Sequence, residues 1–221
     1  MTQRTKIHAA LALLLLAVVL AGVFLHKRHS ADSKRRRIRA LLLTQKITEH
    51  LRTGDVILRK SNGIWSDLFR KISQRDQRFS HVGMILAPNG GPVTVIHAEG
   101  NDYTAMGAVY EQSLEDFLHE GDGAAIYRLN DELQSALPDE GTLAALMRQY
   151  LGRPFDFKLD LTTPDRLYCT EFVYLVHQQY SPPISLTTYT HDNTLYIPVD
   201  SCNAPKLFHE ILSLEYTPLK E

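Results

Sequence analysis

A run of 19 residues without Asp, Glu, Lys or Arg, Ile7 to Leu25, separates a short N-terminal part of this 221-residue chain from the rest. At about 1.5 Å per residue, a helix over this run is about 28 Å long, close to the ~30 Å hydrocarbon core of a bilayer. A cleaved signal peptide has an apolar region of only about 7–15 residues before small residues, and Val19-Leu20-Ala21 could serve as its cleavage site. Because Val23-Phe24-Leu25 continue the run, the sequence favours an uncleaved anchor within residues 1–30.

Basic residues on both sides of the run bear on its orientation. Arg4 and Lys6 precede it, whereas Lys27, Arg28 and a basic stretch at residues 34–39 follow it. Counting Lys and Arg near the two ends favours a cytoplasmic C-terminal side. Apolar spacing predicts a basic connecting helix within residues 31–52. Its first turns either contact anionic headgroups or are simply solvated.

The remaining residues, 53–221, are enough for one domain with its own core. The turn signal Pro88–Pro92 joins two strands as an antiparallel hairpin. We expect an α+β fold with a small antiparallel sheet and flanking helices. The net charge of −1 does not indicate a nucleic-acid partner, and the sequence predicts no oligomeric state. The predicted strands are 56–58, 79–86, 93–99, 124–129 and an edge strand at 195–199, and the predicted helices are 65–72, 113–119, 141–150 and 168–180.

Cys169 is the first candidate for chemistry, because it precedes the apolar residues Phe172 and Val173 at a predicted helix start. Unpaired N–H groups and the partial positive charge at a helix N-terminus lower a thiol pKa and bind an oxyanion. The alternative is a buried, inert cysteine. Cys202 lies in a Pro-rich tail and is interpreted as structural or incidental. The two cysteines could form one disulfide, but a nucleophilic Cys169 must stay free.

His81 is the candidate base, which would take the thiol proton and later protonate the leaving group. Strand alternation places His81, Gly83 and Ile85 on one face. His97 and Glu99 lie two positions apart on the next predicted strand, so they share a face, and either could orient the imidazole. The alternative for each is an ordinary core or strand-end residue.

Four strings carry a family resemblance over residues 53–180: Leu51–Leu58, Ser80-His81-Val82-Gly83, Leu151–Asp156 and Tyr168-Cys169-Thr170-Glu171. With the histidine preceding the cysteine, they resemble the permuted papain-like hydrolases, specifically the YiiX-like branch of the NlpC-type superfamily. The resemblance implies a circularly permuted papain-like domain, and the apolar run Ile7–Leu25 predicts a transmembrane helix before it.

The same resemblance implies roles for individual residues. Cys169 would be the nucleophile and His81 the base. Relatives carry a glutamate in an Ile-Glu-Ala string, whereas this chain has Ile96-His97-Ala98, so His97 takes the third place, as in the Cys-His-His sets of the wider superfamily. Glu99 is the alternative third residue. Tyr168 would line the site or donate a hydrogen bond to the oxyanion, with a packing role as the alternative.

The function expected is a cysteine hydrolase, an amidase, peptidase or esterase, which acts through a thioester on a cell-wall peptide or a lipid acyl group. A thiol-dependent lipid acyltransferase and a non-catalytic binding module are the alternatives. The sequence contains no His-x-x-x-His and no Cys-x-x-Cys, so no metal and no cofactor are expected. Because many relatives are exported, we expect a single-pass protein of the bacterial inner membrane with a periplasmic domain. The Lys and Arg count favours the cytoplasmic alternative.

Overall fold

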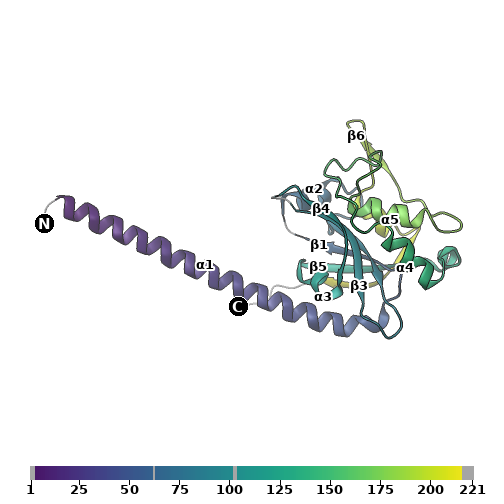
Figure 1. Cartoon of the computed structure of the whole chain (residues 1–221), viewed down its shortest axis with the longest axis horizontal. Helices are drawn as coiled ribbons and strands as arrows, with labels where there is room; N and C mark the ends of the chain where they lie inside the picture. The colour runs from purple at the N-terminus through teal and green to yellow at the C-terminus, as the bar shows by residue number, and fades with distance from the viewer. Residues whose placement is uncertain (1–2, 62, 102–103, 216–221) are drawn as a thin grey trace.

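The computed structural model describes residues 3–61, 63–101 and 104–215, and shows one long helix that leads into an α+β domain (Figure 1). The helices are α1 Gln3–Ile47, α2 Ile64–Ile72, α3 Leu114–His119, α4 Glu140–Arg148 and α5 Cys169–His177, with 3-10 turns at Thr48–His50, Asp131–Ala136 and Val199–Asn203. The strands are β1 Val56–Lys60, β2 His81–Leu86, β3 Thr94–Gly100, β4 Gly107–Ser113, β5 Gly123–Leu129, β6 Tyr189–His191, β7 Thr194–Tyr196 and β8 Phe208–Glu215.

Six of the strands form one antiparallel sheet in the order β4-β3-β2-β1-β5-β8. Gly54 precedes β1 with a φ of 95°, a conformation that favours glycine, and its amide donates to the Ile85 carbonyl at 2.9 Å. Asp55, which is buried, accepts two hydrogen bonds from the Arg128 side chain. These contacts make Gly54 and Asp55 structural residues that fix the start of the central strand.

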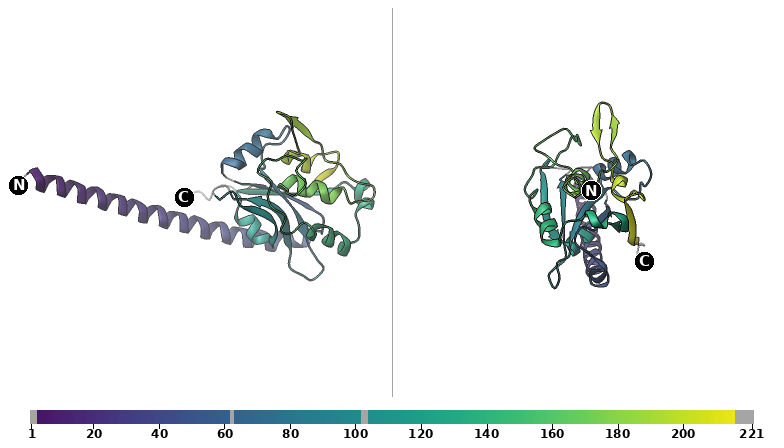
Figure 2. Two further views of the ribbon diagram at one scale, coloured as in Figure 1. Left: turned by 45° about the horizontal axis from the view of Figure 1, so that its top comes forward. Right: turned by 90° about the vertical axis from the view of Figure 1, so that its right-hand side faces the viewer.

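Helices cover both faces of the sheet, and the alternation of side chains along the strands produces two apolar cores (Figure 2). On one face α5 packs against Val82 and Met84 of β2, together with α4. On the other face the C-terminal half of α1 and the short helix α3 pack against Ile57 and Ile85. The domain is therefore a three-layer arrangement in which the sheet separates α5 from α3.

The expected α+β class, the antiparallel hairpin across Pro88–Pro92 and the helix that begins at Cys169 are confirmed. The edge strand predicted at residues 195–199 is wrong. Only Thr194–Tyr196 is a strand, and it pairs with β6 in a separate hairpin, because Asp192 and Asn193 both take positive φ in the turn between them. The outer strands of the main sheet, β4 and β8, were not predicted, since edge strands carry many polar residues.

The connecting helix expected within residues 31–52 is not a separate element, because α1 runs without interruption to Ile47. The basic residues at 34–39 were expected to contact headgroups or to be solvated, but two of them pair with acidic side chains of the domain. Arg36 pairs with Asp122 at 3.0 Å, and Arg37 contacts Glu115 and Asp116 of α3. The basic stretch therefore also joins α1 to the domain.

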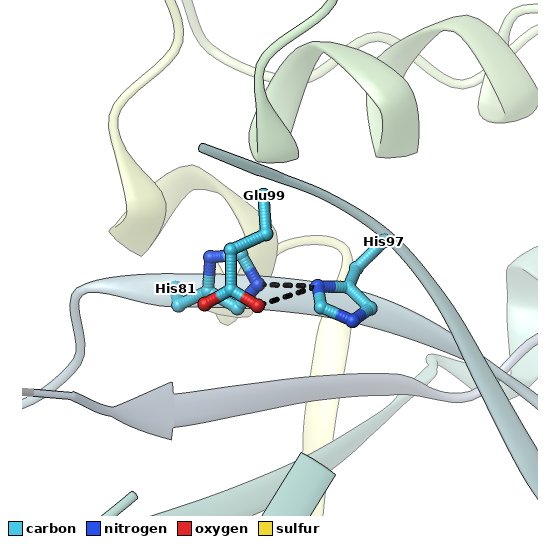
Figure 3. Close-up of side chains that lie close together, drawn as sticks. All are labelled: His81, His97 and Glu99. Carbon is cyan, nitrogen blue, oxygen red and sulfur yellow. Dashed lines mark hydrogen bonds and ion pairs between the residues drawn. The ribbon is translucent and has the colours of Figure 1, made fainter. Parts of the chain in front are cut away.

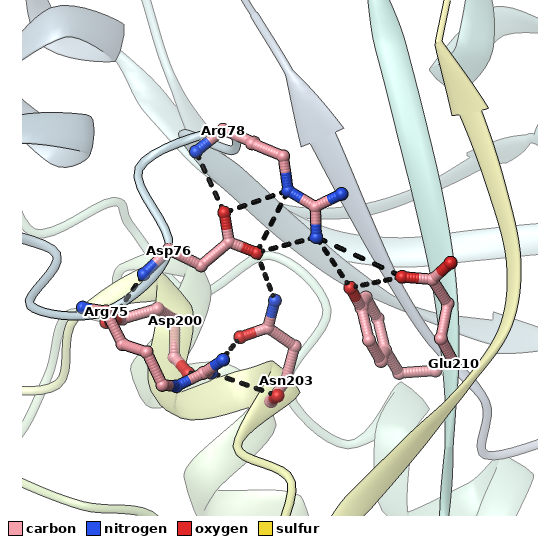
Figure 4. Close-up of polar contacts among 7 residues, drawn as sticks. Arg75, Asp76, Arg78, Asp200, Asn203 and Glu210 are labelled. Atoms are coloured by element: carbon pink, nitrogen blue, oxygen red, sulfur yellow. Dashed lines mark hydrogen bonds and ion pairs between the residues drawn. The ribbon is translucent and has the colours of Figure 1, made fainter.

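The segment between α2 and β2 is held by a polar network against the turn before β8 (Figure 4). Asp200, which is buried, accepts backbone N–H bonds from three consecutive residues, 74–76. The Arg75 side chain donates hydrogen bonds to the backbone oxygen and to the side-chain oxygen of Asn203. Asn203 in turn donates to Asp76 at 2.8 Å. This network fixes the chain that leads into His81.

Candidate active site

The candidate site lies where β2 and β3 separate. Their ladder joins Met84–Leu86 to Thr94–Ile96 and goes no further towards His81. Cys169, the first residue of α5, lies beside this gap, and its thiol is hydrogen-bonded by the backbone N–H groups of Val82 and Thr170. The thiol therefore contacts the residue that follows His81. The local structure explains this contact. The β2–β3 ladder ends at Met84, so the Val82 N–H has no partner among the described residues of β3, and the start of α5 places the Cys169 side chain against it.

The structure brings His81, His97 and Glu99 together on the α3 side of the sheet (Figure 3). His81 Nε2 lies 2.7 Å from His97 Nδ1, and Glu99 Oε2 lies 3.8 Å from the same His97 nitrogen. His97 is fully buried and His81 is 7% exposed. Within the described residues, neither His81 nitrogen is hydrogen-bonded to Cys169. Of the two candidate third residues, His97 is therefore the one in direct contact with His81.

Arg59 completes this cluster and was not identified from the sequence. Its guanidinium is buried, forms ion pairs with Glu99 and Glu120, and lies over the Phe117 ring at 4.5 Å. Register places Arg59 directly opposite His81. The sequence did contain a signal for Arg59, a charged residue after three apolar ones in a short predicted strand. Its partners are Glu99 on β3 and Glu120 at the end of α3, and the sequence alone does not bring these segments together.

Burial and the charges around the cluster determine its protonation. Burial, with the nearby positive charge of Arg59, lowers the pKa of His81 to about 3, and burial lowers that of His97 well below its usual range. For Glu99 burial acts in the opposite direction, but His81 and Arg59 outweigh it and lower the pKa to about 2. Near neutral pH both imidazoles are neutral and the carboxylate is charged.

Cys169 does not have the lowered pKa expected from its place at a helix start. Its side chain is fully buried, and burial raises the pKa to about 12, although the N–H groups of Val82 and Thr170 act in the opposite direction. The helix N-terminus is present, but it does not compensate for desolvation. Near neutral pH Cys169 is therefore a thiol and His81 a neutral imidazole.

Tyr168 has a packing contact that sequence reasoning left open. The residue is 1% exposed, and its hydroxyl accepts the backbone N–H of Ile197 at 2.9 Å. Burial raises the pKa of this phenol. Both cysteines are free thiols, and Cys202 is a buried core residue.

A pocket of about 1070 Å³ opens beside the histidines. His81 lines this pocket and Cys169 does not. Its lining combines polar and apolar side chains, as in many small-molecule sites. The polar residues include Arg59, His81, Glu99, Tyr110 and Glu120, and the apolar residues include Phe69, Met106, Phe155 and Phe157.

The histidine cluster also has the donor types of a metal site. One ligand atom each from His81, His97 and Glu99 lies within 4.8 Å of the others. Two imidazoles and a carboxylate are common zinc ligands. Spacing rules missed the set because it comes from two strands rather than from one helix. However, both oxygens of Glu99 already accept bonds, from Arg59 and from Tyr110 at 2.6 Å. The fixed charge of Arg59 also opposes a divalent cation, so the arrangement does not fit a metal as it stands.

Comparison with known proteins identifies the family of the chain. The profile of the family described as "Permuted papain-like amidase enzyme, YaeF/YiiX, C92 family" matches residues 50–204. The chain belongs to this family. The match extends beyond the residues 53–180 that carried the resemblance, and it confirms the permuted papain-like class.

Two relatives from Escherichia coli illustrate the distance within this permuted family. The uncharacterized protein YiiX of strain K12 is 28% identical over 126 residues, which are 57% of this chain and 57% of that protein. The chain thus matches little more than half the length of this curated relative. The crystal structure of the metalloprotein yiiX from O157:H7 superposes with a TM-score of 0.56 at 19% identity, over 73% of this chain and 96% of the other. That likeness shows the shared fold.

Proposed function

We propose that this protein is a cysteine hydrolase that cleaves an amide or ester through a thioester on Cys169. Two observations support the proposal: the Cys169 thiol at the start of α5 lies beside the backbone of Val82, and the adjacent residue, His81, contacts His97. Membership of a permuted papain-like amidase family supports the same class of chemistry.

The His81–His97 contact suits His81 for the role of base. If His81 Nε2–H donates to His97 Nδ1, the lone pair of His81 Nδ1 is left free on the side of the pocket. Within the described residues Nδ1 has no hydrogen-bond partner. This tautomer holds the ring from behind while its reactive nitrogen faces the substrate, which is the function of a third residue in a triad.

The proposed reaction has two halves. His81 Nδ1 accepts the thiol proton as Cys169 Sγ attacks the carbonyl carbon, and N–H groups at the start of α5 stabilise the oxyanion. The C–N or C–O bond then breaks, the leaving group takes the proton from His81, and a thioester remains. Water attacks the thioester with His81 again as base, which releases the acid and restores the thiol. Because Cys169 rests as a thiol, proton transfer accompanies attack.

Acyl-probe labelling of the full-length protein tests this proposal. We expect a β-lactone acyl probe to label Cys169, to leave Cys169→Ala unlabelled, and to label His81→Ala at least about 100-fold more slowly. Cys202→Ser is the matched control and should label at the wild-type rate. Labelling that is unchanged by His81→Ala would contradict the proposal, and an unlabelled wild type would favour a binding module.

A metal-dependent hydrolase is the second candidate, because three ligand atoms converge and the structural relative from O157:H7 is described as a metalloprotein. In this protein a metal could bind there only if Glu99 gave up its bonds to Arg59 and Tyr110. Dialysis against a zinc chelator separates the two. The cysteine mechanism predicts unchanged turnover and loss of activity in Cys169→Ala. Activity that falls with the chelator, returns with zinc and survives in Cys169→Ala would support the metal. Adding a soluble alcohol or amine acceptor to the same assay distinguishes acyl transfer from hydrolysis.

A further inference from the structure

The helix α1 is fixed to the domain as an arm. Its C-terminal half buries Ala40 and Ile47 in the core on the α3 face, and Arg36 pairs with Asp122. Its described N-terminal part has large apolar side chains that are 48–67% exposed, from Leu14 to Leu25. The helix to which this stretch belongs is long and apolar enough, by length and composition, to cross a membrane. Because one uninterrupted helix contains both parts, the domain has a set position relative to the apolar stretch (Figure 1).

The distance along this arm is short. Ser33, whose carbonyl lies 3.3 Å from His119 Nε2, is the first residue of α1 with a contact of this kind to the domain, and it follows Leu25 by eight positions. Eight residues of helix span about 12 Å. The headgroup layer on each side of a bilayer is about 5–7 Å thick. If the apolar stretch spans a membrane, the near end of the domain lies against that layer.

The pocket opens at this near end. Glu120, a pocket residue, follows His119, which contacts α1 at Ser33, whereas Ile47 lies at the other end of the sheet, close to the start of β1. Both views show α2, which borders the pocket, at the end of the domain that faces the N-terminus of α1 (Figures 1 and 2). The rim residue Met106 is 69% exposed, and Leu68 of α2 is 40% exposed.

From these positions we infer that the pocket takes the acyl chain of a bilayer lipid, which enters from the membrane surface. The inference rests on the proposed function and names its substrate class. The apolar lining residues Phe69, Phe155 and Phe157 would contact the chain, and the ester or amide carbonyl would lie beside His81, which lines the same pocket. The exposed Met106 and Leu68 contact the headgroup boundary, where apolar side chains are stabilised by partial burial.

Lengthening the arm tests the inference. Insertion of seven or fourteen alanine-rich helical residues between Ser30 and Ala31 lifts the pocket by about 10 or 21 Å and keeps its facing, because seven residues rotate a helix by only about 20° from whole turns. The full-length variants are reconstituted in phosphatidylethanolamine and phosphatidylglycerol vesicles with a fluorogenic acyl phospholipid. Turnover of this lipid should fall at least about tenfold with each insertion.

A short-chain soluble thioester in the same vesicles is the control, and its turnover should not change with either insertion. Lipid turnover that is insensitive to both insertions, or a water-soluble peptide turned over in preference to the lipid, would overturn the inference. Met106→Ser with Leu68→Ser is the second variant, for which we expect a higher KM for the lipid and no change for the soluble thioester. If the wild type does not turn over the soluble thioester, the proposed function itself fails.

Discussion

At the residue scale, His97 and Glu99 share one face of β3 but contact different partners. His97 touches His81 directly, whereas Glu99 lies 3.8 Å from His97 Nδ1 and pairs with Arg59. We expect His97→Ala to lower turnover of a reactive ester by about 10²–10⁴-fold, the cost of losing an orienting group, and Glu99→Gln to lower it less. Glu111→Gln, which removes a carboxylate paired with Arg148 away from the histidines, is the control. A larger loss in Glu99→Gln would reverse the assignment.

The thiol of Cys169 gives a second prediction at this scale. Since burial raises its pKa to about 12, we expect iodoacetamide to alkylate Cys169 slowly at pH 7, with a midpoint above the ~8.5 of a free thiol. The measurement follows the rate against pH by mass spectrometry in a Cys202→Ser background. His81→Ala should leave the midpoint nearly unchanged, because the two residues share no hydrogen bond in the described part of the chain. A midpoint below 8.5 that shifts upward in His81→Ala would indicate a preformed thiolate–imidazolium pair.

At the element scale, the start of α5 is held by the residues of the Tyr-Cys-Thr-Glu string itself. Tyr168 is the N-cap of α5, and Glu171 lies buried in its first turn. The Thr170 hydroxyl donates to the Ile197 carbonyl at 2.6 Å. These contacts of its neighbours fix the position of Cys169.

Glu171 makes the stability of this element pH-dependent. Burial, reinforced by Asp156, raises its pKa to about 8 from 4.5. The folded state then favours the protonated acid, so this contribution is complete below pH 4.5 and is lost as pH rises towards 8. We expect Glu171→Gln to raise the free energy of unfolding at pH 8 relative to wild type, by on the order of a few kcal/mol, and to change little at pH 4.5. Urea denaturation at both pH values measures this, and an equal effect at both would exclude the titration.

Most elements near the site could be predicted from the sequence, because β2, β3 and α5 have continuous apolar patterns and end at clear turns. His81, His97 and Cys169 were found for the same reason, since each lies in a short local string. Arg59 was not found, because its partner Glu120 is 61 positions away in the sequence and only the folded chain brings the two together. Nor could local reading predict that burial would outweigh the helix N-terminus at Cys169, since desolvation depends on everything packed around the thiol.

At the scale of the whole molecule, three buried histidines link folding to pH. Besides His81 and His97, His177 lies fully buried at the end of α5, and burial lowers its pKa to about 3. Neither nitrogen of His177 has a hydrogen-bond partner within the described residues. Unfolded histidines bind a proton below about pH 6.5, whereas these stay neutral in the folded protein. Their contribution to stability is therefore complete above pH 6.5 and is lost as pH falls towards 3.

We therefore expect the free energy of unfolding to fall steeply below pH 6.5. At pH 4.5 the loss for a histidine with a folded pKa near 3 is about 3 kcal/mol, from two pH units at about 1.4 kcal/mol each. His177→Leu should remove that share of the acid sensitivity without touching the site, so its stability should change less than that of wild type between pH 7 and pH 4.5. His191→Gln, on an exposed hairpin, is the control and should follow wild type. Parallel curves for wild type and His177→Leu, measured by urea denaturation, would show that His177 is already protonated in the fold.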